Sequence, residues 1–172
     1  MATVAVVVAS GFEQGEMAVL CRTLAEAGHV TRVVSPKKHA VRAWDNTRWN
    51  GDVPVDVAAV DARADDYDAL VLPGGLISAD TLRADGHVVR LLTAAAAAGK
   101  PVAASGHAAW VLVEAGLLNG REATSHPAIR TDVVNAGASW LDRPVAAAGT
   151  ILTGRHRDDA AELAAAVARL LG

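Results

Sequence analysis

Hydrophobic residues occur along the chain in two kinds of segment that take turns: continuous apolar runs, and stretches with apolar residues three or four positions apart. This order predicts strands followed by helices. Uninterrupted apolar runs at 3–9 and 69–72 show no period-two alternation, so each is expected to be a parallel strand buried on both faces. Apolar residues spaced three or four apart predict a helix at 14–27, which Gly28 ends. By the same criteria we expect strands at 30–34 and 101–105 and helices at 85–99, 107–115 and 158–171.

The polar stretch 36–54 interrupts this order. It holds Trp44, Trp49 and the dipeptide Asn50-Gly51, which favours a tight turn, so a hairpin or strand excursion is expected there. Elsewhere strands alternate with helices without an internal repeat. The fold class that follows is α/β: one domain over residues 1–172, built as a three-layer α/β/α sandwich around a mostly parallel sheet.

Composition and charge narrow the function classes. The chain has 172 residues, 52% of them hydrophobic, which suits one packed core and argues against disorder. A net charge of −3 argues against nucleic acid or a membrane surface as a partner. No apolar run reaches the roughly 18 residues of a membrane span, and the chain enters a strand pattern without a signal-like segment. We therefore expect a cytoplasmic protein.

Chemistry is expected at the carboxyl ends of the parallel strands, where open α/β sheets bind ligands. Gly11 and Gly15 do not make the Gly-x-Gly-x-x-Gly of a dinucleotide site, so no such cofactor is expected. Glu16, in the first turn of its helix, either stabilises the positive helix end or serves as a pocket carboxylate, and position alone favours the first. Gly74 and Gly75 form either a simple turn or an oxyanion-binding pair of amides.

The sharp turn at Ser105-Gly106-His107 is the most informative of these strand ends. A nucleophile elbow holds its reactive residue at a strand–helix turn with a positive φ angle. Gly106 occupies that position here, and glycine adopts positive φ without strain but carries no nucleophile. The sequence therefore predicts the elbow geometry without the reactive atom.

A family resemblance is carried by residues 11–16, 68–75, 99–104, 110–117, 124–127 and 132–138, and it covers nearly the whole chain. In these segments the sequence resembles the PfpI family, in the superfamily of class I glutamine-amidotransferase-like domains that also holds the parkinsonism-associated deglycase. The resemblance implies a flavodoxin-like fold and a homodimer. It also implies activities such as glyoxal or methylglyoxal hydration, deglycation, isonitrile hydration, and peptidase or chaperone roles.

The same resemblance implies roles for individual residues. The family's elbow reads Ala-Ile-Cys-His-Gly-Pro; Glu16 matches the glutamate that activates the Cys, His107 the histidine after it, and Gly75 the oxyanion side. This chain departs at the elbow, where Gly106 replaces the Cys and Ser105 the Ile. All covalent activities of the family need the Cys thiolate, so they are in doubt here.

Other candidates are weighed against ordinary structural roles. Cys21 lies mid-helix, which favours an inert buried thiol, and strand alternation points Ser105 away from the Gly106 side, without an obvious general base. The helix start at His107 is expected to lower the pKa of its ring and keep it neutral, as a base or merely as a hydrogen-bonded residue. His126 is expected to border the same pocket. The cluster 155–157, where the family tends to have Arg-x-Pro, favours a solvated loop over an anion site.

Three functions remain open at this point. The first is an enzyme that uses Glu16, His107 and His126 for non-covalent acid–base chemistry on a small metabolite: hydration, elimination, isomerisation or cofactor-independent oxidation. Its substrate-binding residues are expected to be Gly74, Gly75, Gly106 and Trp110. The second is a non-catalytic binding or stress protein, and the third a glyoxalase or deglycase whose Cys has been replaced by Gly. No metal site is expected, because the histidines show no ligand spacing.

Overall fold

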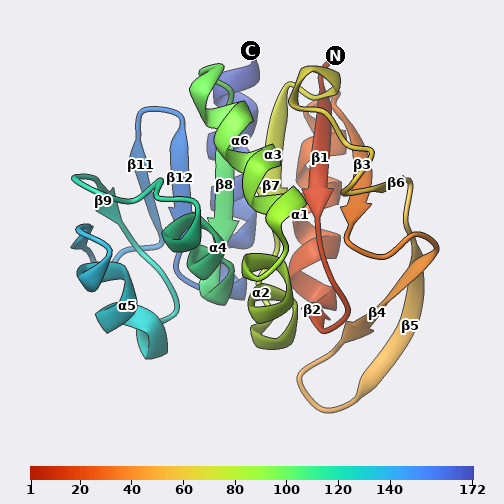
Figure 1. Ribbon diagram of the computed structural model, residues 1–172, viewed down its shortest axis with the longest axis horizontal. Coiled ribbons are helices and arrows are strands. Elements are labelled where there is room, and N and C mark those ends of the chain that lie inside the picture. Colours follow the sequence, from red (N-terminus) through yellow and green to blue (C-terminus); the bar gives the residue numbers. More distant parts are fainter.

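Seven strands form the central sheet of the computed structural model, which describes residues 1–172 (Figure 1). They are β1 (Thr3–Val7), β3 (Val30–Ser35), β6 (Val57–Ala58), β7 (Ala69–Leu72), β8 (Val102–Ser105), β11 (Val145–Ala148) and β12 (Ile151–Gly154). Their order is β11-β12-β8-β7-β1-β3-β6, and every pair is parallel except β11 with β12. The predicted mostly parallel α/β sheet is confirmed.

Helices cover both faces of this sheet and make the three layers. One face carries α1 (Gln14–Glu26) and α6 (Ala160–Leu171), and the other carries α2 (Leu76–Arg83), α3 (Gly86–Ala97) and α4 (Ala109–Glu114). Alternate side chains of one strand serve the two layers: Val4 and Val6 pack with α1 and α6, and Ala5 and Val7 pack with α3 and α4. This explains why the run at the start of the chain is apolar without alternation.

A hairpin extends from one end of the sheet, at the lower right of Figure 1. It consists of β4 (Ala40–Trp44) and β5 (Trp49–Pro54), and the short β2 (Phe12–Glu13) adds to it in parallel. The hairpin was expected, but the expected turn was wrong, because Asn50-Gly51 lies within β5 and residues 45–48 make the turn. There Asn46 takes a positive φ of 74° and Asp45 accepts the backbone N–H groups of Thr47 and Arg48.

Several elements were not anticipated. They are the short strands β2 and β6, α2, β9 (Glu122–Ala123), α5 (Arg130–Asn135), β10 (Ser139–Trp140), the antiparallel pair β11–β12, and single 3-10 turns at Ala64–Asp66, Pro127–Ile129 and Arg157–Asp159. The helix expected from residue 107 begins instead as a 3-10 turn, Gly106–Ala108, and becomes α-helical only at Ala109. These segments are short, so their sequence periodicity is weak and tertiary contacts decide their structure.

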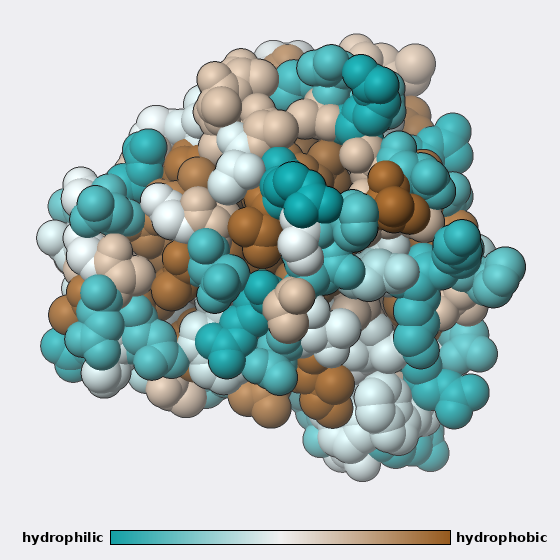
Figure 2. Space-filling model, viewed as in Figure 1, coloured by the Kyte–Doolittle hydropathy of each residue, from teal (hydrophilic) through white to brown (hydrophobic).

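The surface seen in Figure 2 shows hydrophobic residues in separate small groups between hydrophilic ones. The large exposed apolar side chains accordingly belong to different elements: Val30 to β3, Leu76 and Ile77 to α2, Val134 to α5 and Leu170 to α6. None of the helices has the length and apolar character needed to cross a membrane.

Candidate functional site

The site begins at the N-terminus of α1, where two carboxyl groups lie within one turn. Glu13 is the N-cap: its side chain accepts the backbone N–H of Glu16 at 2.6 Å. Its own backbone N–H donates to the carbonyl of Gly74 at 2.8 Å, which ties this turn to the end of β7. The cap leaves the Glu16 side chain free to reach across the strand ends.

Glu16 is the best-placed acid–base group of the protein. Only 3% of the residue is exposed, and Oε2 accepts the N–H of Gly74 at 2.8 Å. Oε1 has no hydrogen-bond partner, nor has Oγ of the buried Ser105, whose hydroxyl approaches the carboxyl without forming a full hydrogen bond. Burial raises the pKa of Glu16 from 4.5 to about 7, against the opposing effects of Ser105 and Gly74. The carboxyl therefore exchanges its proton near neutral pH.

The elbow after β8 has the predicted geometry. Gly106 takes a φ of +56°, the left-handed region that favours glycine, and it lines the same cavity as Glu16. A Cβ placed on Gly106 would have a single neighbour within 4 Å, the carbonyl oxygen of Arg155 at 3.8 Å. The position is therefore open toward the cavity and has room for a side chain.

His107 and His126 form a stacked pair at the cavity. Their ring centroids are 4.3 Å apart with an interplanar angle of 23°. Nδ1 of His126 accepts the backbone N–H of Ala128 at 3.2 Å, so the neutral ring carries its proton on Nε2. Burial, and after it the neighbouring His126, lowers the pKa of His107 from 6.5 to about 4. The expected direction was right, but its expected cause was not, since the residue lies in a 3-10 turn ahead of a six-residue helix.

Replacing His126 by Phe tests this arrangement, because it keeps a stacked ring and removes the neighbouring charge. The pKa of His107 is expected to rise in the variant but to stay below its ordinary value, because burial is the larger cause. Proton NMR titration of the His107 ring measures this, with wild-type protein expected to titrate near pH 4. A wild-type midpoint at or above 6.5 would contradict the buried, stacked geometry.

These groups surround a cavity of about 410 Å³ at the carboxyl edge of the sheet. Its volume lies near the lower end of small-molecule sites, which begin at about 300 Å³. The sequence-predicted residues that line it are Glu16, Gly74, Gly75, Gly106, His107 and His126. No group of three or more His, Cys, Asp or Glu side chains has an arrangement that could hold a metal ion.

Four residues considered in the sequence have surroundings other than those expected. Trp110 does not line the cavity: its indole N–H donates to Asp132 at 2.7 Å, and its ring stands edge-on behind His107. The Gly74 amide is already used by Glu16, so it and Gly75 do not make a free donor pair. Ser105 faces Glu16 and thus has a carboxyl beside it, contrary to expectation, but it is fully buried.

Sequence reasoning missed part of the lining: Glu13, Trp44, Asn46, His156 and Arg157. The cluster at 155–157 is not simply a solvated loop. Arg155 is held by Asp142 at 2.9 Å and Asp159 at 3.2 Å, while His156 and Arg157 face the cavity. No strand was expected before this segment, so the sequence carried no signal that would have placed it at the site.

With this geometry in view, comparison with known proteins identifies the family. The model of the DJ-1/PfpI family matches residues 2–170. The chain belongs to the DJ-1/PfpI family. It is 34% identical over 151 residues to the Deglycase PfpI of Pyrococcus furiosus, covering 88% of both chains. It is 37% identical over 158 residues to General stress protein 18 of Bacillus subtilis, covering 91% of this chain and 90% of that one.

Solved structures of the family share the fold. The DJ-1/ThiJ/PfpI-like part of a two-domain Anabaena variabilis protein, which also has a ferritin-like domain, superimposes with a TM-score of 0.93 at 32% identity. That match covers all of this chain and 48% of the other. DJ-1beta of Drosophila melanogaster gives a TM-score of 0.88 at 27% identity, covering 98% and 89% of the two chains. The DJ-1/PfpI fold expected from the sequence is confirmed.

Proposed function

We propose that this DJ-1/PfpI chain is an enzyme that acts on a small metabolite by non-covalent acid–base chemistry, without a cysteine nucleophile. The observation that supports this best is the Glu16 carboxyl, with a pKa of about 7, in the cavity that the open position at Gly106 also lines. At neutral pH both of its protonation states are populated, so it serves as acid or base in turn. Relatives named deglycases support a substrate with a carbonyl-derived group.

The proton of Glu16 is expected on one particular oxygen. Oε2 accepts the N–H of Gly74, so the acidic proton sits on Oε1, which has no other partner. A substrate atom or water in the space beside Gly106 receives that proton, and the resulting carboxylate takes one back. Hydration, elimination and isomerisation all need such a proton carrier. The neutral rings of His107 and His126 supply further hydrogen bonds and hold no charge against the reacting group.

Gly106→Cys separates this proposal from a thiol-dependent one. The side chain fits the available space, so the variant is expected to fold, with a cost of about 1–3 kcal/mol for the positive φ. Because the Cys side chain fills part of the cavity that Glu16 also lines, turnover of the enzyme's own substrate should fall. Gly106→Ala is the matched control for backbone strain, and turnover is followed on a panel of small carbonyl compounds.

Two results, one from that experiment and one from a separate alkylation of the wild-type protein, would contradict acid–base catalysis. One is an inert wild-type protein together with a Gly106→Cys variant that rapidly converts methylglyoxal, which would favour the third function considered above, a Cys-dependent glyoxalase or deglycase that has lost its Cys. The room at Gly106 favours that candidate too. The other is a loss of wild-type turnover when Cys21, the single thiol of the chain, is alkylated with iodoacetamide, because acid–base catalysis by Glu16 does not need that thiol.

The homodimer and the cytoplasmic location stay predictions. A mass measurement by light scattering in solution tests the first. Cell fractionation tests the second.

A further inference from the structure

Arg157 is the one arginine whose side chain lines the cavity, and it is weakly held. Its Nη1 donates to Oε1 of Glu13 at 3.4 Å, a single long contact, and its Nε lies 4.0 Å from Asp158. The side chain is 54% exposed. A guanidinium has five N–H donors in a planar fork, so most of the donors of Arg157 have no partner.

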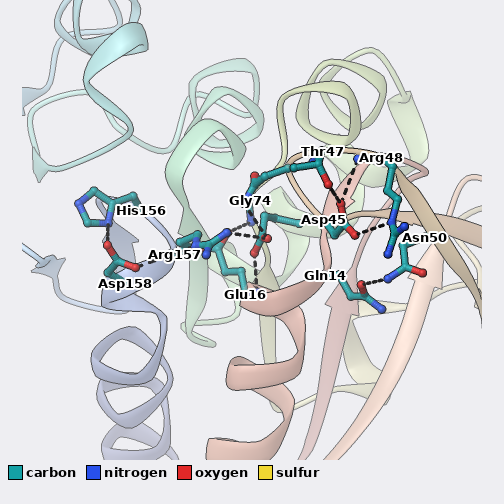
Figure 3. A network of polar contacts seen from close by, with 12 residues as sticks. Gln14, Glu16, Asp45, Thr47, Arg48, Asn50, Gly74, His156, Arg157 and Asp158 are labelled. Carbon is teal, nitrogen blue, oxygen red and sulfur yellow. Dashed lines mark hydrogen bonds and ion pairs between the residues drawn. The ribbon is translucent and has the colours of Figure 1, made fainter.

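Glu13 does not depend on this contact. Its carboxyl already accepts the Glu16 N–H at 2.6 Å and the Asn46 side-chain amide at 3.4 Å. The pair is exposed on the arginine side only: the Arg157 side chain is 54% exposed and that of Glu13 9%. Since Glu13 keeps those two donors when the long Arg157 contact breaks, Arg157 can turn from Glu13 to a ligand. Figure 3 shows Arg157 reaching from beside Asp158 toward Glu16 and Gly74.

A second group of donors lies on another wall of the same cavity. Gly75, Leu76 and Ile77, the N-terminal residues of α2, line it, and the first N–H groups of a helix have no partner within the helix. An independent pointer to a ligand is Oε1 of Glu16, which is deeply buried and unpartnered on the floor of the cavity. The cavity thus has an acid–base group at its buried end and a weakly paired cation at its exposed end.

We propose that Arg157 binds an oxyanion on the substrate, so that the substrate is a small metabolite with a carboxylate or phosphate group near its reacting carbon. This inference rests on the proposed function and names its substrate class. The anionic group lies between the guanidinium and the first turn of α2, and the rest of the molecule extends to Glu16 and Gly106.

NMR titration tests the proposal through the Arg157 Nε–H signal and the backbone amides of α2. The probes are pyruvate, its neutral counterpart pyruvamide, and inorganic phosphate. We expect pyruvate or phosphate to shift these signals and pyruvamide to leave them unmoved. Arg157→Gln should weaken binding of the anion at least about tenfold, because a charge-assisted hydrogen-bonded pair is lost. Arg157→Lys should restore part of the binding, and whichever anion binds more tightly identifies a carboxylate or a phosphate substrate.

Arg169→Gln is the matched control, because it removes the same charge from the exposed end of α6. It should leave anion binding unchanged. Equal binding of pyruvate and pyruvamide, equal binding by wild type and Arg157→Gln, or no anion binding would each overturn the proposal. The titration and the activity assay are repeated with Glu16→Gln. If wild type and variant both bind the anion but neither converts a substrate, the inferred ligand class stands and only the proposed acid–base catalysis is refuted.

Discussion

Replacing Glu16 by Gln is expected to stabilise the folded protein by about 3 kcal/mol at about pH 8 while it abolishes turnover. The buried carboxyl ionises near pH 4.5 in the unfolded chain but only near 7 in the folded protein. Gln keeps an acceptor for the Gly74 N–H and has no charge to bury. For a chain of this size the gain corresponds to about 6–12 °C in Tm.

The gain in stability should depend on pH in a defined direction. Below pH 4.5 both states of wild type hold the Glu16 proton, and the variant has no advantage. Between pH 4.5 and about 7 the unfolded chain releases the proton and the folded protein keeps it, so wild-type stability falls as pH rises. Above about 7 the full difference is present. Urea unfolding of both proteins at several pH values measures this.

Turnover provides the second half of this test. Loss of a general acid–base group costs about 10²–10⁴-fold in rate, so Glu16→Gln should lose at least about 100-fold. Glu26→Gln, on the exposed end of the same helix, is the control and should change neither stability nor rate. A Glu16→Gln protein that is as active as wild type, or less stable above neutral pH, would show that Glu16 is not the buried proton carrier described above.

Gly75→Ala is expected to be the most destabilising single-methyl change in the chain. Gly75 has a φ of +121°, and a Cβ there would lie 2.8 Å from Cα of Phe12, 2.9 Å from N of Glu13 and against the carbonyl of Gly11. These are backbone atoms of the turn that caps α1, so they cannot move without disturbing Glu16. Strain and overlap together should cost about 4 kcal/mol or more.

Gly28→Ala is the comparison that isolates overlap from strain. Gly28 also has a positive φ, +85°, but a Cβ there meets nothing within 4 Å. It should cost only about 1–2 kcal/mol. Thermal unfolding of both variants measures the difference, and equal losses of Tm would show that β2 and the start of α2 are not in the close contact described here.

The sequence was sufficient for the parts of the fold that are long and continuously apolar. The strand at 69–72 and the helix from Gln14 agree with the structure almost residue for residue. The Asn50-Gly51 turn was misplaced because Asp45 and Asn46 provide a competing turn that is fixed by side-chain hydrogen bonds. α2 was missed because its eight residues follow a Pro-Gly-Gly turn and show no clear period.

The candidate site was predictable where strand ends or the family pattern marked it. Glu16, Gly106, His107 and His126 do come together at one cavity. Arg157 could not be found by pattern, because it reaches the site only when the segment after β12 is placed beside β8. Trp110 failed for the opposite reason: sequence proximity to the elbow says nothing about a ring that turns toward α5.

The parallel pairing of β2 with β4 has a mechanical consequence. Phe12 and Glu13 are both the third strand of the protruding hairpin and the residues that start α1. A displacement of the hairpin would therefore shift the first turn of α1, which carries Glu16. A molecule that binds the exposed face of Trp49 would therefore act on the position of Glu16 through β4, β2 and the start of α1.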